Sequence, residues 1–129
     1  MKVQKIINEH AAGRSYFGGV VLEVEYAPRA AGSSDLLLGF SSYVQHDETF
    51  HPAAQEGVEY FFSCYAPAHP GDLLVEVLGF HELAGDTTAA VIVYATVLAL
   101  AEALHFPIAG LAFDPAAGTL RLPAPARVE

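Results

Sequence analysis

The residues LLVEVLGF (73–80), HELAGD (81–86) and TTAAVIVYATVLALAEALH (87–105) follow one another without a break. The first piece is a short and strongly apolar run, which favours a central β-strand. The second piece is a turn, and Asp86 and the two threonines after it are candidate helix N-caps. The third piece is apolar on nearly every side and ends before Pro107, so it predicts a second helix in the core.

Upstream of this stretch the chain predicts strands. Residues 16–26 alternate apolar and polar side chains, which is the period of a half-buried strand. Residues 35–44 form a second such strand, and the loop 28–34 between them is rich in Gly, Pro and Ser. We therefore expect these two strands to pair as an antiparallel hairpin. A short strand could also open the chain at 1–9.

A first helix is expected at residues 53–65, because apolar side chains recur there every three or four positions. Pro52 suits the first turn of a helix, where its missing N–H costs nothing. Gly57 lowers helix propensity by about 1 kcal/mol relative to Ala, which indicates close packing on a neighbour. Downstream, residues 111–113 and 119–122 predict a final hairpin.

Together these elements predict an α+β fold, a two-layer sandwich in which two helices cover one face of a mainly antiparallel sheet. The length of 129 residues fits a single domain, 1–129, in which 123–129 form a tail. No repeat or linker interrupts the chain.

The predicted helix at 87–105 has two interpretations. An ordinary surface helix has one apolar stripe, whereas this one is apolar nearly all round. It could be buried under the first helix and the final hairpin, or it could contact another chain and form a homodimer. The uncharged part, 87–101, is shorter than the roughly 20 residues needed to cross a bilayer, so we expect no membrane span.

The charge of the chain constrains its partners. Fifteen Asp and Glu against six Lys and Arg give a net charge of −9. Such a surface repels phosphate backbones, which argues against direct binding to DNA. A basic protein surface is the easier partner. The single Cys64 allows no internal disulfide, and residues 1–10 lack the apolar run of a signal peptide, so a cytoplasmic location is expected.

No motif for catalysis, a cofactor or a metal emerges. The loop histidines lack the tight spacing of zinc ligands, and Cys64 lies in a segment typical of a core. Loops carry function on rigid scaffolds, so the loops 45–50 and 66–72 are the candidate contact regions. The candidate partner contacts in them are His46, Asp47, Glu48, His69 and Asp72.

From Tyr16 to Leu104 the chain resembles domain IV of the translocase elongation factor G. The resemblance rests on the order of two strands, a Pro-led helix with a central Gly57, the loop His69-Pro70-Gly71-Asp72, a central strand and an Ala-rich helix after Asp86-Thr87. It implies the fold of that domain, with its left-handed strand–helix–strand crossover, and a place near the ribosome. The chain has no GTPase domain or phosphate loop, and its second helix is more apolar than the family's.

Three functions remain open. The first is a non-enzymatic binding protein, such as an inhibitor or an immunity-type protein, that acts on a basic partner. The second is a ribosome-associated accessory factor, which the resemblance alone implies. The third is a small enzyme that uses the loop histidines.

Overall fold

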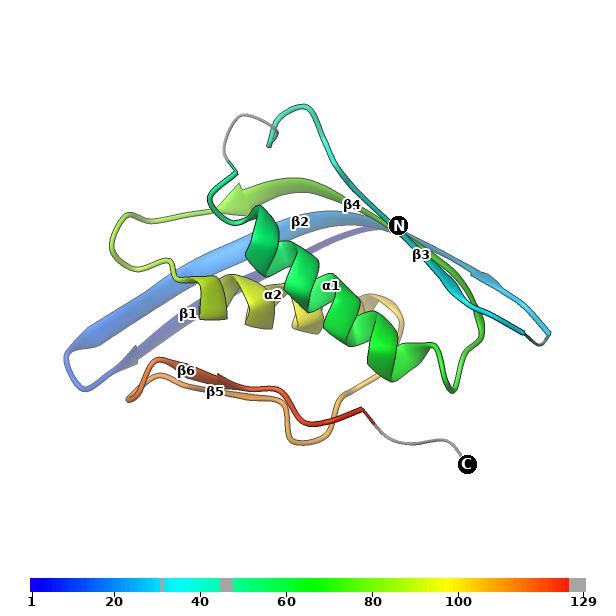
Figure 1. Cartoon of the computed structure of the whole chain (residues 1–129). Helices are drawn as coiled ribbons and strands as arrows, with labels where there is room; N and C mark the ends of the chain where they lie inside the picture. The colour runs from blue at the N-terminus through cyan, green and yellow to red at the C-terminus, as the bar shows by residue number, and fades with distance from the viewer. Residues whose placement is uncertain (31, 45–47, 126–129) are drawn as a thin grey trace.

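The computed structural model describes residues 1–30, 32–44 and 48–125. Two helices cover one face of a four-stranded sheet, and a short hairpin packs below them (Figure 1). The fold is thus an α+β two-layer sandwich, as expected. The elements are β1 (Lys2–Ala11), β2 (Arg14–Pro28), β3 (Asp35–Phe40), α1 (His51–Tyr65), β4 (Gly71–His81), α2 (Ala89–Ala103), β5 (Ala112–Asp114) and β6 (Thr119–Arg121).

The pairing of the strands differs from the expected one. The sheet has the order β1-β2-β4-β3, so β4 lies between β2 and β3. The predicted hairpin of residues 16–26 and 35–44 is therefore wrong. The first strand pairs instead with β2, and β3 runs parallel to β4. The physical reason is α1, because a helical crossover returns the chain in the same direction and lets two parallel strands become neighbours.

A tight turn joins β1 to β2. Ala11 pairs with Arg14, which leaves a loop of two residues. Ala12 has a φ of 54° and Gly13 a φ of 75°. Two positive φ values in a two-residue loop define a type I′ turn, whose twist matches that of the flanking strands. This turn fixes the register of the two strands that it joins.

The helices touch at Gly57, as its mid-helix position indicated. A Cβ atom added there would lie 2.8 Å from the Cβ of Thr96 in α2. The Thr96 hydroxyl is fully buried and donates to the Ile92 carbonyl at 2.7 Å. Gly18 likewise allows close packing, since a Cβ there would meet Val91 at 2.8 Å. The pairing of β2 with β4 shifts register between Val21 and Leu22, where the extra residue, Leu78, lies in β4.

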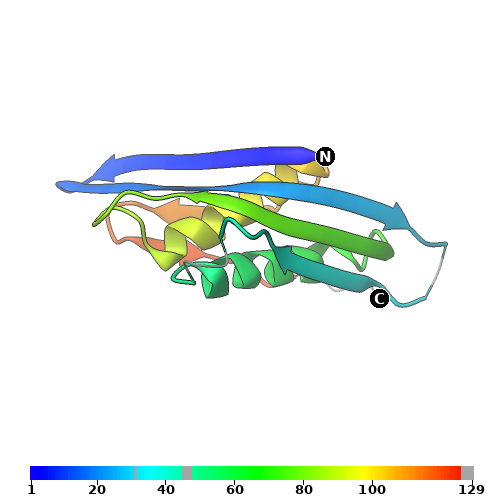
Figure 2. The ribbon, with the colours of Figure 1, turned by 90° about the horizontal axis from the view of Figure 1, so that it is seen from above.

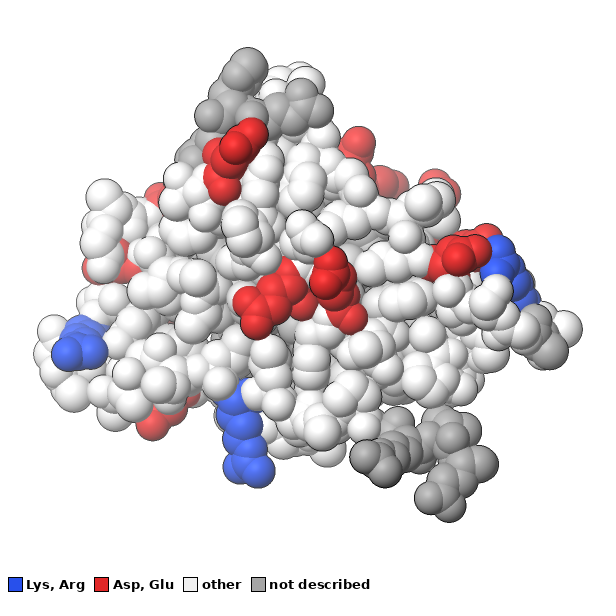
Figure 3. Space-filling model, viewed as in Figure 1, with Lys and Arg blue, Asp and Glu red and all other residues white. Residues whose placement is uncertain are grey.

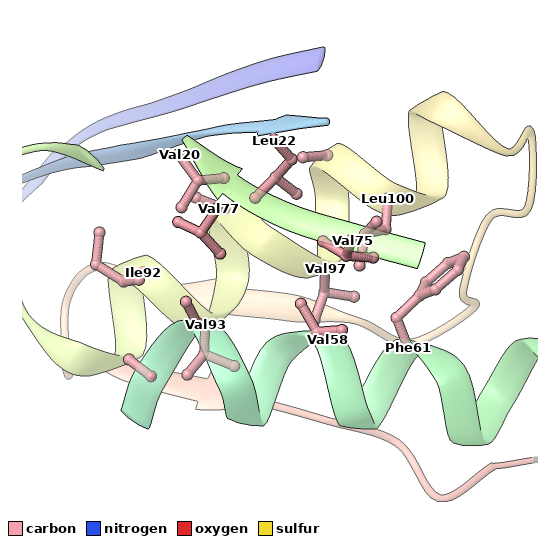
Figure 4. Close-up of a cluster of buried hydrophobic side chains, with 14 of the residues drawn as sticks. Val20, Leu22, Val58, Phe61, Val75, Val77, Ile92, Val93, Val97 and Leu100 are labelled. Carbon is pink, nitrogen blue, oxygen red and sulfur yellow. The ribbon is translucent and has the colours of Figure 1, made fainter. Parts of the chain in front are cut away.

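The all-round apolar character of α2 is explained within the chain. The sheet lies on one side, α1 on another, and the β5–β6 hairpin also contacts the helix. Only Ala89 and Glu102 of the fifteen helix residues are exposed. Figure 4 shows α2 side chains such as Ile92, Val97 and Leu100 between the sheet and α1. A homodimer through this helix stays a prediction, but its burial does not require one.

Thr88 caps α2, because its side chain accepts a hydrogen bond from the Val91 amide at 3.3 Å. The neighbouring Thr87 has a different role and donates from its hydroxyl to the Phe17 carbonyl at 2.6 Å, which ties the start of α2 to β2. Within the described residues, neither α2 nor any other helix has the length and hydropathy to cross a membrane.

Candidate functional site

The two loops predicted to contact a partner lie at opposite ends of α1. One precedes His51, the first residue of the helix, and the other follows Tyr65, the last. A helix of this length spans about 22 Å. His46 and Asp47 lie outside the described residues, and Glu48 is exposed. The described part of the first loop, residues 48–50, therefore lies at the other end of α1 from the second loop.

His69 has partners within the chain. Its ring stacks on Tyr65, with centroids 4.6 Å apart, and meets the edge of Phe106 at 5.6 Å. Burial, and then the nearby Tyr26, raise the pKa of the Tyr65 hydroxyl above its ordinary value. His69 itself is still exposed, so its ring covers apolar surface and leaves one side for solvent.

Asp72 is half-buried and belongs to an ion-pair cluster. Its carboxylate lies 2.7 Å from the Arg29 guanidinium, which also contacts Asp35 at 3.2 Å. The Arg29 amide donates to the Pro70 carbonyl, so the cluster joins the loop before β3 to the loop before β4. The Oδ1 atom of this carboxylate faces Arg29 and helps to hold the two loops together, although it makes no hydrogen bond of normal geometry.

The described histidines do not gather into a metal site. His51 stacks on Phe40, and its Nε2 lies 2.6 Å from the Val44 carbonyl. His81 lies 3.1 Å from Gln4 on the sheet. In the described ranges no three His, Cys, Asp or Glu side chains come close enough to hold a metal ion.

Cys64 lies on α1 beside Tyr60 and is half-buried. Burial, and then the neighbouring thiol, raise the pKa of the Tyr60 hydroxyl well above its ordinary value. That hydroxyl donates to the Pro123 carbonyl. The Tyr60 hydroxyl therefore joins the segment around Pro123 to α1.

The most unusual surface is the face of the sheet that no described helix or hairpin covers. Side chains alternate along the strands, so Val75 and Val77 point into the core and Leu74 and Glu76 point outward. Leu37 on β3 also points outward and is 61% exposed, and Leu74 is 36% exposed. Two neighbouring leucines thus face solvent on an open sheet.

Three glutamates surround these leucines. Glu23 on β2 lies directly opposite Glu76 on β4, and Glu25 lies opposite Leu74. Leu74 in turn lies beside Leu37. We call the surface of Glu23, Glu25, Leu37, Leu74 and Glu76 the acidic sheet face. Like charges placed opposite each other on paired strands destabilise a sheet, so this arrangement costs the free protein stability.

The charges of the acidic sheet face are only partly neutralised. The N-terminal ammonium of Met1 lies 2.9 Å from the Glu23 carboxylate, and both groups are largely exposed. An exposed ion pair of this kind contributes about 0–1 kcal/mol. Glu25 and Glu76 have no ion pair with any described residue. Two unpaired carboxylates therefore remain beside the exposed leucines.

The acidic sheet face is hollowed at its centre. A shallow depression of about 400 Å³ runs over it and is lined by the three glutamates and by Leu37 and Leu74. Gly39 also lines the depression. The space beside it is empty, since a Cβ added there would meet no atom within 4 Å. The depression is open and mostly apolar with a charged border.

Sequence reasoning did not single out this surface. The alternation places Glu23 and Glu25 on the outward side of β2 and Glu76 on the outward side of β4. It does not say that β2 and β4 are neighbours, because period-two patterning defines the faces of a strand and leaves its partner open.

Negative charge also extends over the other side of the molecule. Figure 3 shows the side that bears the helices, where red carboxylates outnumber blue cations. Glu56 and Glu59 of α1 line a depression there with Pro52 and Tyr60. That surface is also negatively charged but has no exposed leucine among its described lining residues. Charge variants there therefore serve as a control for variants of the acidic sheet face.

Comparison with known proteins shows the fold alone. No protein-family model matches the sequence, and no curated protein matches it. A solved structure from Thermus thermophilus superposes on 78% of this chain with a TM-score of 0.59 and 17% sequence identity. The matched part is 15% of the length of that protein. The chain is therefore similar in fold to one portion of a much longer protein.

Proposed function

We propose that this chain is a binding protein that recognises a basic protein partner through its acidic sheet face. The observation that carries the proposal is that Glu25 and Glu76, which have no ion pair among the described residues, lie beside the solvent-exposed Leu37 and Leu74. Lysine or arginine of a partner would neutralise the carboxylates while its apolar side chains cover the leucines. An inhibitor or immunity-type role in the cytoplasm fits such a contact.

The like-charge arrangement supports this proposal. A sheet that placed Glu23 opposite Glu76 for stability alone would break a local rule without a gain. A cationic partner removes that cost on binding. The net charge of −9 also accelerates encounter with a basic protein, and this contribution weakens as salt increases.

The test is a pull-down from cells that produce the protein, with two charge variants. Glu25→Lys with Glu76→Lys reverses the acidic sheet face. Glu56→Lys with Glu59→Lys makes the same change of net charge on α1. We expect the wild type and the α1 variant to retain one basic protein at low salt, and the sheet variant to lose it. If both variants lost the partner equally, net charge alone would explain the binding, and the proposal would be contradicted.

A second candidate is a ribosome-associated factor that resembles a stand-alone domain IV of elongation factor G. The support is the order of elements from Tyr16 to Leu104 and the parallel β3–α1–β4 unit, together with the fold-level match to part of a longer protein. The negative charge opposes contact with ribosomal RNA. Co-sedimentation with ribosomes over a range of salt concentrations separates the two functions.

A further inference from the structure

The outer edge of β1 is a free edge of the sheet. β1 is the first strand in the order β1-β2-β4-β3, and among the residues that the structure describes no strand lies beyond it (Figure 2). The Met1 carbonyl accepts from the Val24 amide, and Ala11 pairs with Arg14 across the turn. Odd-numbered residues of β1 therefore bond to β2. By the alternation of an antiparallel ladder, the even-numbered backbone groups, from Lys2 to His10, point away from the sheet.

This edge lacks most of the features that keep sheet edges apart. Monomeric proteins protect edges with short strands, prolines, bulges and charged side chains, and of these β1 has only the charges, at Lys2, Lys5 and Glu9. β1 has ten residues, contains no proline and pairs with β2 without a register shift. The opposite edge, β3, has six residues. The central Ile6 of β1 is 41% exposed, so an apolar side chain also lies on the free edge.

The region around β1 differs in charge from the rest of the chain. Residues 1–14 contain three of the six Lys and Arg (Lys2, Lys5 and Arg14) and one of the fifteen acidic residues, Glu9. Two molecules with a net charge of −9 repel each other over most of their surfaces. The β1 edge does not share the acidic excess of the rest of the chain.

We propose that two copies pair through antiparallel β1 strands about a two-fold axis at Ile7. This register places Lys5 of one copy opposite Glu9 of the other, twice, on the same face as Ile7. The neighbouring register, centred on Ile6, places Lys5 opposite Ile7 and leaves its charge without a partner. The first register is therefore self-complementary in charge.

The side chains are in place for this pairing. Lys5 already contacts Glu102 of α2 at 2.7 Å, and an ammonium group can donate three hydrogen bonds. Glu9 is exposed and has no ion pair within the described residues. Ile7 is 5% exposed, and its copy would extend the core across the axis. The dimer would carry one continuous sheet, with both acidic sheet faces on the same side.

Light scattering after size-exclusion chromatography tests the proposal at tens of micromolar protein. The wild type is expected to be a dimer. Asn8→Pro removes an amide that points away from β2, so it should leave the monomer folded and halve the measured mass. A wild-type monomer, or a dimer that survives Asn8→Pro, as one formed through α2 would, overturns the proposal.

Charge and register are tested separately. Glu9→Lys should weaken dimerisation by about tenfold. Adding Lys5→Glu together with Glu102→Lys, which keeps the ion pair to α2, should restore it. In a Cys64→Ser background, Ile7→Cys should form an intermolecular disulfide and Ile6→Cys should not. Two results would contradict the proposed register. One is an intermolecular disulfide in Ile6→Cys but not in Ile7→Cys, and the other is a compensated variant that dimerises no more tightly than Glu9→Lys. These measurements need no basic partner, so they are independent of the proposed function.

Discussion

Gly57 provides a test of packing at the scale of one residue. Gly57→Ala gains about 1 kcal/mol of helix propensity but places a methyl group 2.8 Å from the Cβ of Thr96. Overpacking of a rigid core costs typically about 1–3 kcal/mol, so the clash should win. We expect the free energy of unfolding to fall, by up to about 2 kcal/mol, in urea titrations.

Gly79→Ala is the matched control, because a Cβ at Gly79 meets no atom within 4 Å. Its effect should stay within about 0.5 kcal/mol. An equal loss in both variants would show that backbone freedom, and not the contact with Thr96, accounts for the cost.

Glu76 is a residue at which stability and function should oppose each other. Glu76→Gln removes one of two like charges that face each other across β2 and β4. We expect the free energy of unfolding to rise by about 0.2–1 kcal/mol, while binding of the basic partner weakens. Glu56→Gln on α1 should change neither quantity beyond the error of calorimetry and binding measurements. A loss of stability in Glu76→Gln would contradict the assigned cost of the like-charge pair.

At the scale of elements, the β1–β2 turn stores a small amount of strain. Ala12 has a φ of 54°, a conformation that costs an ordinary L-residue roughly 1–2 kcal/mol. Ala12→Asn should raise the melting temperature, because Asn tolerates this region and favours type I′ turns. Gly13→Ala, at a φ of 75° and with no atom near the added Cβ, should lower it. Opposite signs are the expected result, and equal signs would refute the turn assignment.

The helices and strands were predictable from the sequence, but their arrangement in the sheet was not. Both helices and the runs of all strands were predicted to within a few residues, because hydrophobic periodicity, Pro52 and Pro107 mark them locally. The neighbours in the sheet were not predicted, because β2 and β4 meet only after the chain has passed through β3 and α1. Pairing of distant strands depends on tertiary packing, which local patterns do not encode.

The predicted contact residues also depend on tertiary structure that the sequence does not show. His69 and Asp72 were chosen as loop residues, but the structure gives the first an aromatic stack and the second an ion pair with Arg29. Glu25 and Glu76 attract little notice in the sequence, since each occupies an ordinary outward position in a strand. Their significance arises when β2 and β4 become neighbours beside Leu37.

At the scale of the whole molecule, the structure separates a helix-covered side from an open one. The helices, the β5–β6 hairpin and the buried α2 account for one face of the sheet. The other face carries exposed leucines, with two carboxylates that have no ion pair among the described residues. A dimer formed through β1 would present two such faces side by side and increase the avidity for a partner with repeated basic segments.

The central claim is that the acidic sheet face is the surface that binds. Nuclear magnetic resonance measures it most directly, by following the leucine methyl signals of the protein as the basic partner is added. We predict that the signals of Leu37 and Leu74 shift, while those of Leu122, beside Glu56 and Glu59, stay in place. Shifts at Leu122 with unchanged signals from Leu37 and Leu74 would contradict the claim.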